Sequence, residues 1–225
     1  MEVIKSWPAI VRRAKSLLEI DKRVLLGITG PPGAGKSTLS RELKFDLGDS
    51  VQVVEMDGFH LSQERLMELG RLDRMGAIDT FDATGFVELV RQVRDSTGTT
   101  IYAPKFRRDI GTSIENAVAI EASVKLVIVE GNYLLMQDRP WVELRTLLDE
   151  VWYCEREESS RIEGLIARRR TYGQSDSEAR EWALGSDRLN AEQIADTKSQ
   201  ADLIVALDLK KVRMIEFKQS ADSED

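Results

Sequence analysis

Two glycines, a lysine and a serine near the start of the sequence have the spacing of a phosphate-binding loop. The pattern G-x-x-x-x-G-K-[ST] is met from Gly30 to Ser37, between an apolar segment and a helical one. In such a loop backbone N–H groups point at phosphate oxygens, the lysine reaches the β and γ phosphates, and the hydroxyl can ligate Mg²⁺. We therefore predict that a nucleotide is bound by Gly30, Pro31, Pro32, Gly33, Ala34, Gly35, Lys36, Ser37 and Thr38.

Acidic residues end two further apolar segments. Glu130 follows VKLVIV, which is the Walker B arrangement, where a carboxylate faces Mg²⁺ directly or through water. Asp57 follows VQVVEM, where a carboxylate can accept the proton of an attacking hydroxyl while sharing the field of the metal. We predict a metal site made by Ser37, Glu130 and Asp57, with Asp57 also catalytic and substrate-binding and Lys36 catalytic.

An arginine-rich segment predicts a mobile lid at about residues 157–175. SSRIEGLIARRRTYG carries four arginines on a helix that ends at Gly173, namely Arg161, Arg168, Arg169 and Arg170. Such side chains can fold over a triphosphate and offset the charge of the transferring phosphoryl group. A solvated helix face is the alternative, but beside a phosphate-binding loop we expect at least one arginine to contact phosphate.

Polar residues near these motifs are candidates for binding the acceptor. His60, the single histidine, lies three residues after Asp57 and is expected to face the same crevice, or else to bond to backbone in a turn. Asp82 is expected either in the pocket or as the cap of a helix. The predicted substrate set is Asp57, His60, Arg74, Asp82, Tyr102, Lys105, Arg107, Asn132 and Tyr133.

The elements that must position these residues alternate along the chain. Five short apolar runs read as strands buried on both faces: RVLLGITG, VQVVEMDG, VKLVIVEG, EVWYCE and ADLIVALD. Helices are expected at 7–20, 84–95 and 140–148, and after a capping box at Ser175 and Glu178. Residues 99–123 predict an inserted β-hairpin. This order indicates an α/β fold, a three-layer sandwich of a central parallel sheet with helices on both faces.

The whole chain fits one domain. Its 225 residues, 42% of them hydrophobic, suffice for one core, which we place in residues 1–217, with a disordered tail at 218–225 and with Trp152 and Trp182 in the core. A net charge of −7 argues against a nucleic-acid partner. The charged N-terminal segment argues against a signal peptide or membrane span, so we expect a cytoplasmic protein, monomer or homodimer, in a reducing compartment that suits its single Cys154.

A phosphate-binding loop alone does not identify the reaction. A GTPase needs a base-reading N-K-x-D or T-K-x-D motif, and DTKSQAD has Gln200 where the acid belongs. A transport ATPase needs a signature such as L-S-G-G-Q, which the sequence lacks. A small-molecule kinase needs a strand-end base and an arginine-rich lid, and both are present. The alternative interpretation is a nucleotide-dependent switch or regulatory ATPase without a small-molecule acceptor.

Five motifs together resemble a known group of kinases. GITGPPGAGKST, EMDGFHL, GAIDTFD, YAPKFRR and VIVEGNYLL occur in the order seen in uridine kinase, phosphoribulokinase and bacterial pantothenate kinase, and the sequence resembles in particular the branch labelled fructose-transport-system kinase or nucleoside/nucleotide kinase-like. The resemblance covers about residues 20–210. It implies a P-loop kinase fold with a five-stranded parallel sheet, ATP and Mg²⁺ as cosubstrates, and phosphorylation of a hydroxyl on a small metabolite.

The same resemblance implies roles for single residues. Asp57 matches the catalytic aspartate of the group and Glu130 its acid on the Mg²⁺ side. Arg168, with Arg169 or Arg170, matches the lid arginines, so Arg168 is expected to be catalytic and Arg168 and Arg170 to bind the nucleotide. The SDRLNA segment resembles the aspartate–asparagine pattern of the branch, so Asp187 and Asn190 are expected to position the nucleotide or the lid.

Overall fold

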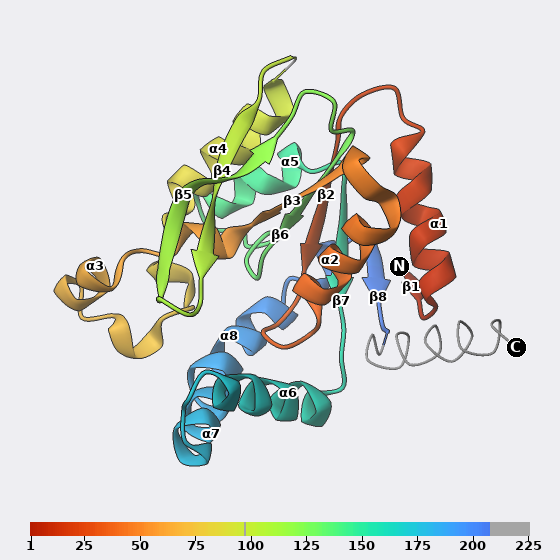
Figure 1. Cartoon of the computed structure of the whole chain (residues 1–225). Helices are drawn as coiled ribbons and strands as arrows, with labels where there is room; N and C mark the ends of the chain where they lie inside the picture. Colours follow the sequence, from red (N-terminus) through yellow and green to blue (C-terminus); the bar gives the residue numbers. More distant parts are fainter. Residues whose placement is uncertain (97, 208–225) are drawn as a thin grey trace, which may run out of the picture.

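A computed structural model of the chain describes residues 1–96 and 98–207; the predicted tail at 218–225 and the end of the predicted domain lie outside them. Its centre is a sheet of six parallel strands in the order β1-β8-β7-β2-β6-β3 (Figure 1). The strands are β1 (Glu2–Ile4), β2 (Val24–Thr29), β3 (Val51–Glu55), β6 (Leu126–Glu130), β7 (Glu150–Cys154) and β8 (Leu203–Val205).

All five strands predicted from apolar runs are present, but the expectation of five strands in total is wrong. The N-terminal residues Glu2–Ile4 add a sixth strand, β1, which pairs in parallel with β8. A three-residue edge strand with only Ile4 buried is too short to show a pattern in the sequence.

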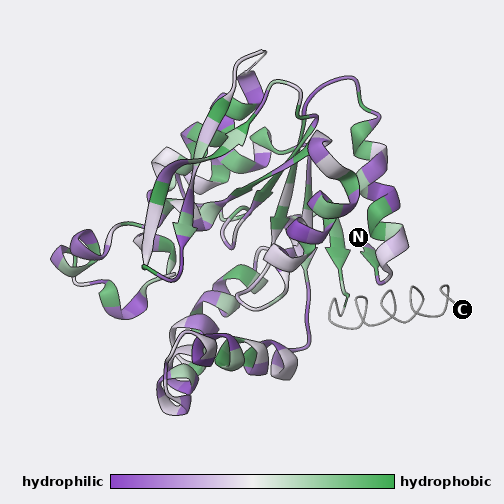
Figure 2. Cartoon of the chain, viewed as in Figure 1, coloured by the Kyte–Doolittle hydropathy of each residue, from purple (hydrophilic) through white to green (hydrophobic). Residues whose placement is uncertain are grey.

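Helices cover both faces of the sheet, which confirms the predicted three-layer sandwich. On one face α1 (Trp7–Leu18) and α2 (Lys36–Leu47) pack Ile10 and Leu39 against β2 and β6. On the other face α4 (Ala83–Asp95) and α5 (Leu144–Leu147) pack Phe86 and Leu144 against the opposite side of the same strands. Figure 2 shows the strands as the most hydrophobic part of the molecule, as a sheet buried on both faces requires.

The predicted hairpin and lid stand outside this sandwich. Strands β4 (Ile101–Arg107) and β5 (Thr112–Ile120) form a separate antiparallel sheet. The predicted lid at about residues 157–175 falls on α6 (Glu158–Thr171), and it is followed by α7 (Asp176–Leu184), which begins with the predicted capping box, and α8 (Ser186–Ala195). The three helices together are called the lid below. Leu165 and Ile166 of α6 pack on Ala179 and Ala183 of α7 in a small core of their own.

The remaining elements are short. The six-residue helix α3 (Gln63–Glu68) follows a 3₁₀ turn at Met56–Phe59. Further 3₁₀ turns lie at Gly48–Ser50, Leu72–Arg74, Ile78–Thr80, Trp141–Glu143 and Lys198–Gln200. The predicted helix at 140–148 is thus a 3₁₀ turn followed by α5. Trp152 is fully buried, whereas Trp182 is half-buried on the lid. No helix within the described ranges is long and apolar enough to cross a membrane.

Candidate active site

The strand order brings the predicted site together at one edge of the sheet. Strand β6 lies between β2 and β3, and Glu130 at its end pairs with Ile28 of β2 on one side and with Glu55 of β3 on the other. The loop that starts at Gly30, the Glu130 carboxyl group and Asp57 therefore all leave the sheet at its carboxyl edge. In open α/β sheets this edge is where ligands bind.

The phosphate loop has a backbone that needs glycine. Gly30 has a φ of 137°, and a Cβ there would lie 2.5 Å from the carbonyl oxygen of Cys154. Gly33 has a φ of 80°, and its Cβ would lie 2.9 Å from Cγ of Leu165 on the lid. Both positions combine a left-handed conformation with close neighbours, so a side chain at either would deform the cradle.

Lys36 begins α2 and is buried beneath the loop. Its ammonium group donates hydrogen bonds to the carbonyl oxygens of Gly30 at 2.8 Å and Pro31 at 3.1 Å. Burial lowers the pKa of Lys36, an effect that the nearby carboxylate of Glu130 opposes. Other predicted loop residues lie in the same turn or in the first turn of α2: Pro32, Ala34, Gly35 and Thr38.

Ser37 and Glu130 are in direct contact. The Ser37 hydroxyl donates to Oε2 of Glu130 at 3.0 Å. Glu130 is 7% exposed, and its burial raises the pKa of the carboxyl group to about 7, against the opposing charge of Lys36. A hydroxyl and a carboxylate beside a phosphate cradle fit Mg²⁺, which takes one or two protein oxygens and completes its shell with water and phosphate oxygens.

Asp57 lies in the 3₁₀ turn Met56–Phe59 that follows β3, and it forms an ion pair with Arg108 at the tip of the hairpin. Burial would raise the pKa of Asp57, but Arg108, His60 and Lys36 outweigh it, so the pKa lies below the ordinary value. Asp57 is therefore a carboxylate at neutral pH, able to accept a hydrogen bond from a hydroxyl group.

The His60 ring packs between two phenylalanine rings and forms a hydrogen bond with the backbone. Its ring lies 4.1 Å from that of Phe81 and 4.7 Å from that of Phe106, measured between centroids. Nδ1 is 2.8 Å from the carbonyl oxygen of Asp57, and because a carbonyl only accepts, Nδ1 carries the proton. Burial lowers the pKa of His60, so the neutral ring offers Nε2 as an acceptor. The backbone bond expected of a turn histidine is thus present, and contact with substrate stays a prediction.

The lid is attached to the phosphate loop through arginines. Arg161 is 4% exposed and donates to the carbonyl oxygen of Pro32 at 3.1 Å, and Arg156 donates to that of Gly33 at 3.4 Å. Arg161, one of the four predicted phosphate-binding candidates, therefore holds the loop backbone in this structure.

The three consecutive lid arginines, Arg168, Arg169 and Arg170, differ in their interaction partners. Arg168 is exposed on the surface of α6, and within residues 1–96 and 98–207 its guanidinium has no hydrogen-bond or ion-pair partner. Loss of hydration on the side facing the site and the charge of Arg108 lower the pKa of Arg168. Arg169 pairs with Asp187 at 3.2 Å and lies 4.5 Å above the ring of Trp182. Arg170 pairs with Asp176 at 3.4 Å at the start of α7. Of the three, Arg168 is the one whose positive charge helps to lower the pKa of Asp57.

Two of the predicted acceptor residues lie near the strand ends. Tyr133 is fully buried and its hydroxyl donates to the carbonyl oxygen of Gly76 at 2.7 Å. Asn190 of α8 donates to the same oxygen at 3.3 Å, so the lid and the loop before α4 meet there. The carbonyl oxygen of Asn132 accepts from the Thr29 hydroxyl at 3.0 Å.

The other predicted acceptor residues have protein partners or face solvent. The Asp82 carboxylate accepts from the backbone N–H of Gly85 at 2.9 Å as the N-cap of α4. Arg74 pairs with Asp79 at 2.7 Å, and Arg107 donates to Asp109 at 2.9 Å. Tyr102 is 54% exposed on β4.

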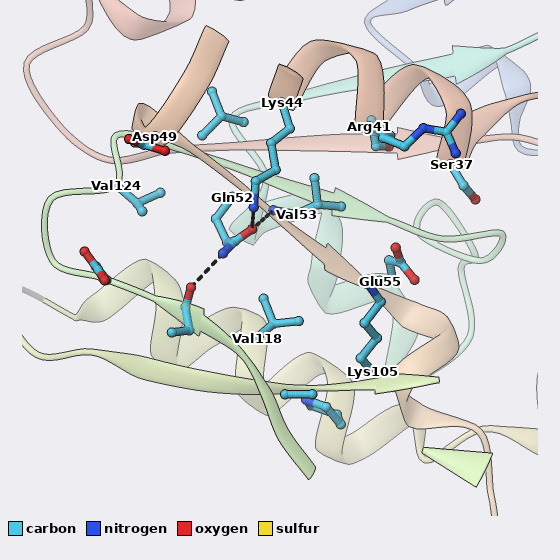
Figure 3. A pocket seen from close by; sticks show the side chains of 16 residues that line it. Ser37, Arg41, Lys44, Asp49, Gln52, Val53, Glu55, Lys105, Val118 and Val124 are labelled. Atoms are coloured by element: carbon cyan, nitrogen blue, oxygen red, sulfur yellow. Dashed lines mark hydrogen bonds between the residues drawn. The ribbon is translucent and has the colours of Figure 1, made fainter. Parts of the chain in front are cut away.

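A groove of about 800 Å³ runs beside the phosphate loop, between α2 and β3 on one side and the hairpin on the other (Figure 3). Lys105 of the hairpin and Glu55 of β3 face each other across it, with Ser37 nearby (Figure 3). Gln52 spans it by donating to the carbonyl oxygen of Ala119 at 2.8 Å. Gln52 belongs to no motif, and Glu55 opens the EMDGFHL motif without being assigned a role there, so reasoning from the sequence missed both.

Arg108 is one of the hairpin cations of YAPKFRR that could bind an anionic substrate or only solvate a flap, but the predicted substrate set contains only Lys105 and Arg107 among them. The sequence run FRRD offers two adjacent cations, and the predicted set contains Arg107. In the structure Arg107 ends β4 and turns to Asp109, whereas Arg108 lies in the hairpin turn and reaches Asp57. The position of one residue in the turn decides which guanidinium enters the site.

This fold and site define a P-loop kinase, and comparison with known proteins agrees. No family model matches the sequence. A Schizosaccharomyces pombe protein whose name proposes a uridine kinase is 37% identical over 169 residues, covering 69% of this chain and 70% of that one. The uridine kinase of Clostridium novyi is 30% identical over 186 residues, 81% of this chain and 86% of its own.

A solved structure gives the same result. A Silicibacter sp. TM1040 protein provisionally assigned as a fructose transport system kinase has a TM-score of 0.78 and 32% identity, covering 87% of this chain and 98% of that one. The chain belongs to the P-loop kinase family that includes uridine kinase. It is therefore a phosphotransferase with an alcohol group as acceptor, which leaves the alternative of a switch without support.

Proposed function

We propose that this protein transfers the γ-phosphoryl group of ATP, with Mg²⁺, to a hydroxyl of a small metabolite such as a sugar, a sugar acid, a nucleoside or a pantothenate-like compound. The observation that carries the proposal is the position of the Asp57 carboxylate. It leaves the sheet at the same edge as the phosphate loop and Glu130, with the charges of Lys36 and Arg168 close enough to lower its pKa. A base, a phosphate cradle and a pair of metal ligands are the parts that phosphoryl transfer needs.

Each residue has a role that its surroundings support. Ser37 and Glu130 would hold Mg²⁺, which when bound neutralises charge on the phosphate oxygens. Lys36 and Arg168 supply positive charge where the phosphoryl group transfers. Asp57 orients the acceptor hydroxyl and takes its proton as the hydroxyl oxygen bonds to phosphorus and the bond to the ADP oxygen breaks.

The test is an ADP-release assay with ATP and Mg²⁺ over a panel of sugars, sugar acids, nucleosides, pantothenate and sugar phosphates. We expect one class to stimulate turnover, and Asp57→Asn to reduce kcat by about 10²- to 10⁴-fold with ATP affinity nearly unchanged. Asp196→Asn, on the exposed end of α8, is the matched control. Unchanged turnover in Asp57→Asn would reject Asp57 as the base and direct attention to His60.

A further inference from the structure

The ion pair between Arg108 and Asp57 joins the hairpin tip to the proposed base. Arg108 comes from the turn between β4 and β5, and its side chain is 39% exposed, while that of Asp57 is 27% exposed. The negative charges of Asp57 and Glu130 both raise the pKa of Arg108. The Arg108 guanidinium thus interacts with the charges of both active-site acids and is partly exposed to solvent.

This contact conflicts with the role of a base. An acceptor hydroxyl must come within hydrogen-bond distance of the Asp57 carboxylate, one oxygen of which, Oδ2, already accepts from Arg108. Arg108 has no second ion-pair partner in the described part of the chain. Glu130, whose charge also acts on Arg108, is engaged, because it accepts from the Ser37 hydroxyl.

A second cation adds to the conflict. Arg168 also lies near enough to Asp57 to interact with its charge, and it has no partner among the described residues. The charges of Arg168 and Arg108 repel each other, and the charge of Arg108 accordingly lowers the pKa of Arg168. Three cations, Lys36, Arg108 and Arg168, therefore act on the Asp57 carboxylate, beside which the acceptor hydroxyl must lie. The phosphates of ATP are expected to bind Lys36 and Arg168. Arg108 is then the one of the three cations whose anionic partner is Asp57 itself.

We propose that Arg108 recognises an anionic group of the acceptor, a carboxylate or a phosphate monoester, and that this contact draws its guanidinium from Asp57 and frees the base for the acceptor hydroxyl. The inference depends on the proposed function, since it concerns the acceptor of the same reaction. It makes Arg108 a specificity-determining residue, because a neutral acceptor carries no anionic group that could replace Asp57 as the ion-pair partner of the guanidinium. Arginine suits this exchange because its five N–H donors bind carboxylates and phosphates in a planar fork.

The alternative is that Arg108 only holds Asp57 in place. In that case its loss lowers kcat for every acceptor by the same factor, whatever the charge of the acceptor. Anion recognition instead predicts that the loss depends on the acceptor and appears mainly in KM. Acceptors that differ only by the anionic group separate the two roles.

The experiment compares matched pairs: pantothenate with panthenol, D-glycerate with glycerol, and a pentose 5-phosphate with the free pentose. Steady-state kcat and KM are measured for the wild type, Arg108→Gln and Arg108→Lys. We expect the wild type to prefer the anionic member of one pair and Arg108→Gln to raise its KM by about 10- to 100-fold, with kcat/KM for the neutral member nearly unchanged. Arg108→Lys is expected to keep part of the preference, because the charge remains. The responding pair tells carboxylate from phosphate.

Arg65→Gln is the control, because Arg65 is an exposed arginine on α3 that pairs with Glu68. Equilibrium binding of the same pairs, with a non-hydrolysable ATP analogue, gives a readout that needs no turnover. Anion binding that depends on Arg108 supports the inference even if no compound is phosphorylated, which would reject the proposed function alone. A preference for neutral acceptors, or equal losses for both members of each pair, would overturn the inference and leave the kinase intact.

Discussion

Replacing Glu130 by glutamine should stabilise the protein when neither nucleotide nor metal is bound. Glu130 is 7% exposed at the end of β6, and burial raises its pKa from 4.5 to about 7. Ionising Glu130 therefore costs more free energy in the folded state than in the unfolded state. Glutamine removes that charge and keeps an oxygen that can accept from the Ser37 hydroxyl.

The sign and size of the effect follow from linkage. Below pH 4.5 Glu130 is protonated in both states and the substitution should change little. Between pH 4.5 and 7 the unfolded state ionises first, so the wild type loses stability, and above pH 7 the loss is complete. A rise from 4.5 to about 7 corresponds to about 3 kcal/mol, which for a chain of this size is about 6–12 °C in Tm.

The assay is thermal unfolding in EDTA from pH 5 to pH 9, comparing the wild type with Glu130→Gln and with Glu163→Gln, an exposed position on α6. The difference in Tm should grow from about a quarter of its full value at pH 5 to the full value above pH 8, and only for Glu130→Gln. A Glu130→Gln protein less stable than the wild type at every pH would refute the reasoning, because it would mean that Lys36 compensates the buried charge. With Mg²⁺ and ATP restored, the same variant should bind nucleotide more weakly.

Two further substitutions test the surroundings of the site. A Cβ at Gly58 would lie 2.4 Å from the carbonyl oxygen of Pro104, so Gly58→Ala should displace the hairpin and raise the KM of the acceptor but not that of ATP; equal increases in both would contradict this. Asp82→Ala should remove the N-cap of α4 and cost about 1 kcal/mol in urea unfolding, with the acceptor KM unchanged; a higher KM at full stability would place Asp82 in the pocket instead.

The parts of the site that depend on local sequence were predictable, and the rest required contacts between distant segments. The phosphate loop, the acids at the ends of β3 and β6 and the capping box of α7 each have a pattern within a dozen residues, and the hairpin has one within residues 99–123. The choice of Arg108 over Arg107 has no such pattern, because it depends on how the hairpin turn lies over Asp57. Gln52 and Glu55 acquire their places only when the hairpin covers the edge of β3.

The sequence by itself determined the class of fold and the chemistry available at its edge. Alternating apolar runs and helical stripes specify a parallel sheet between helices, and the loop and strand-end acids specify phosphate and metal. Only the tertiary structure decided which charges meet: that Arg108 and Arg168 approach Asp57, that Arg170 turns to Asp176, and that Glu130 is buried. The physical reason is that burial and the distance between charges, which set pKa values and ion pairs, arise from segments far apart in the chain.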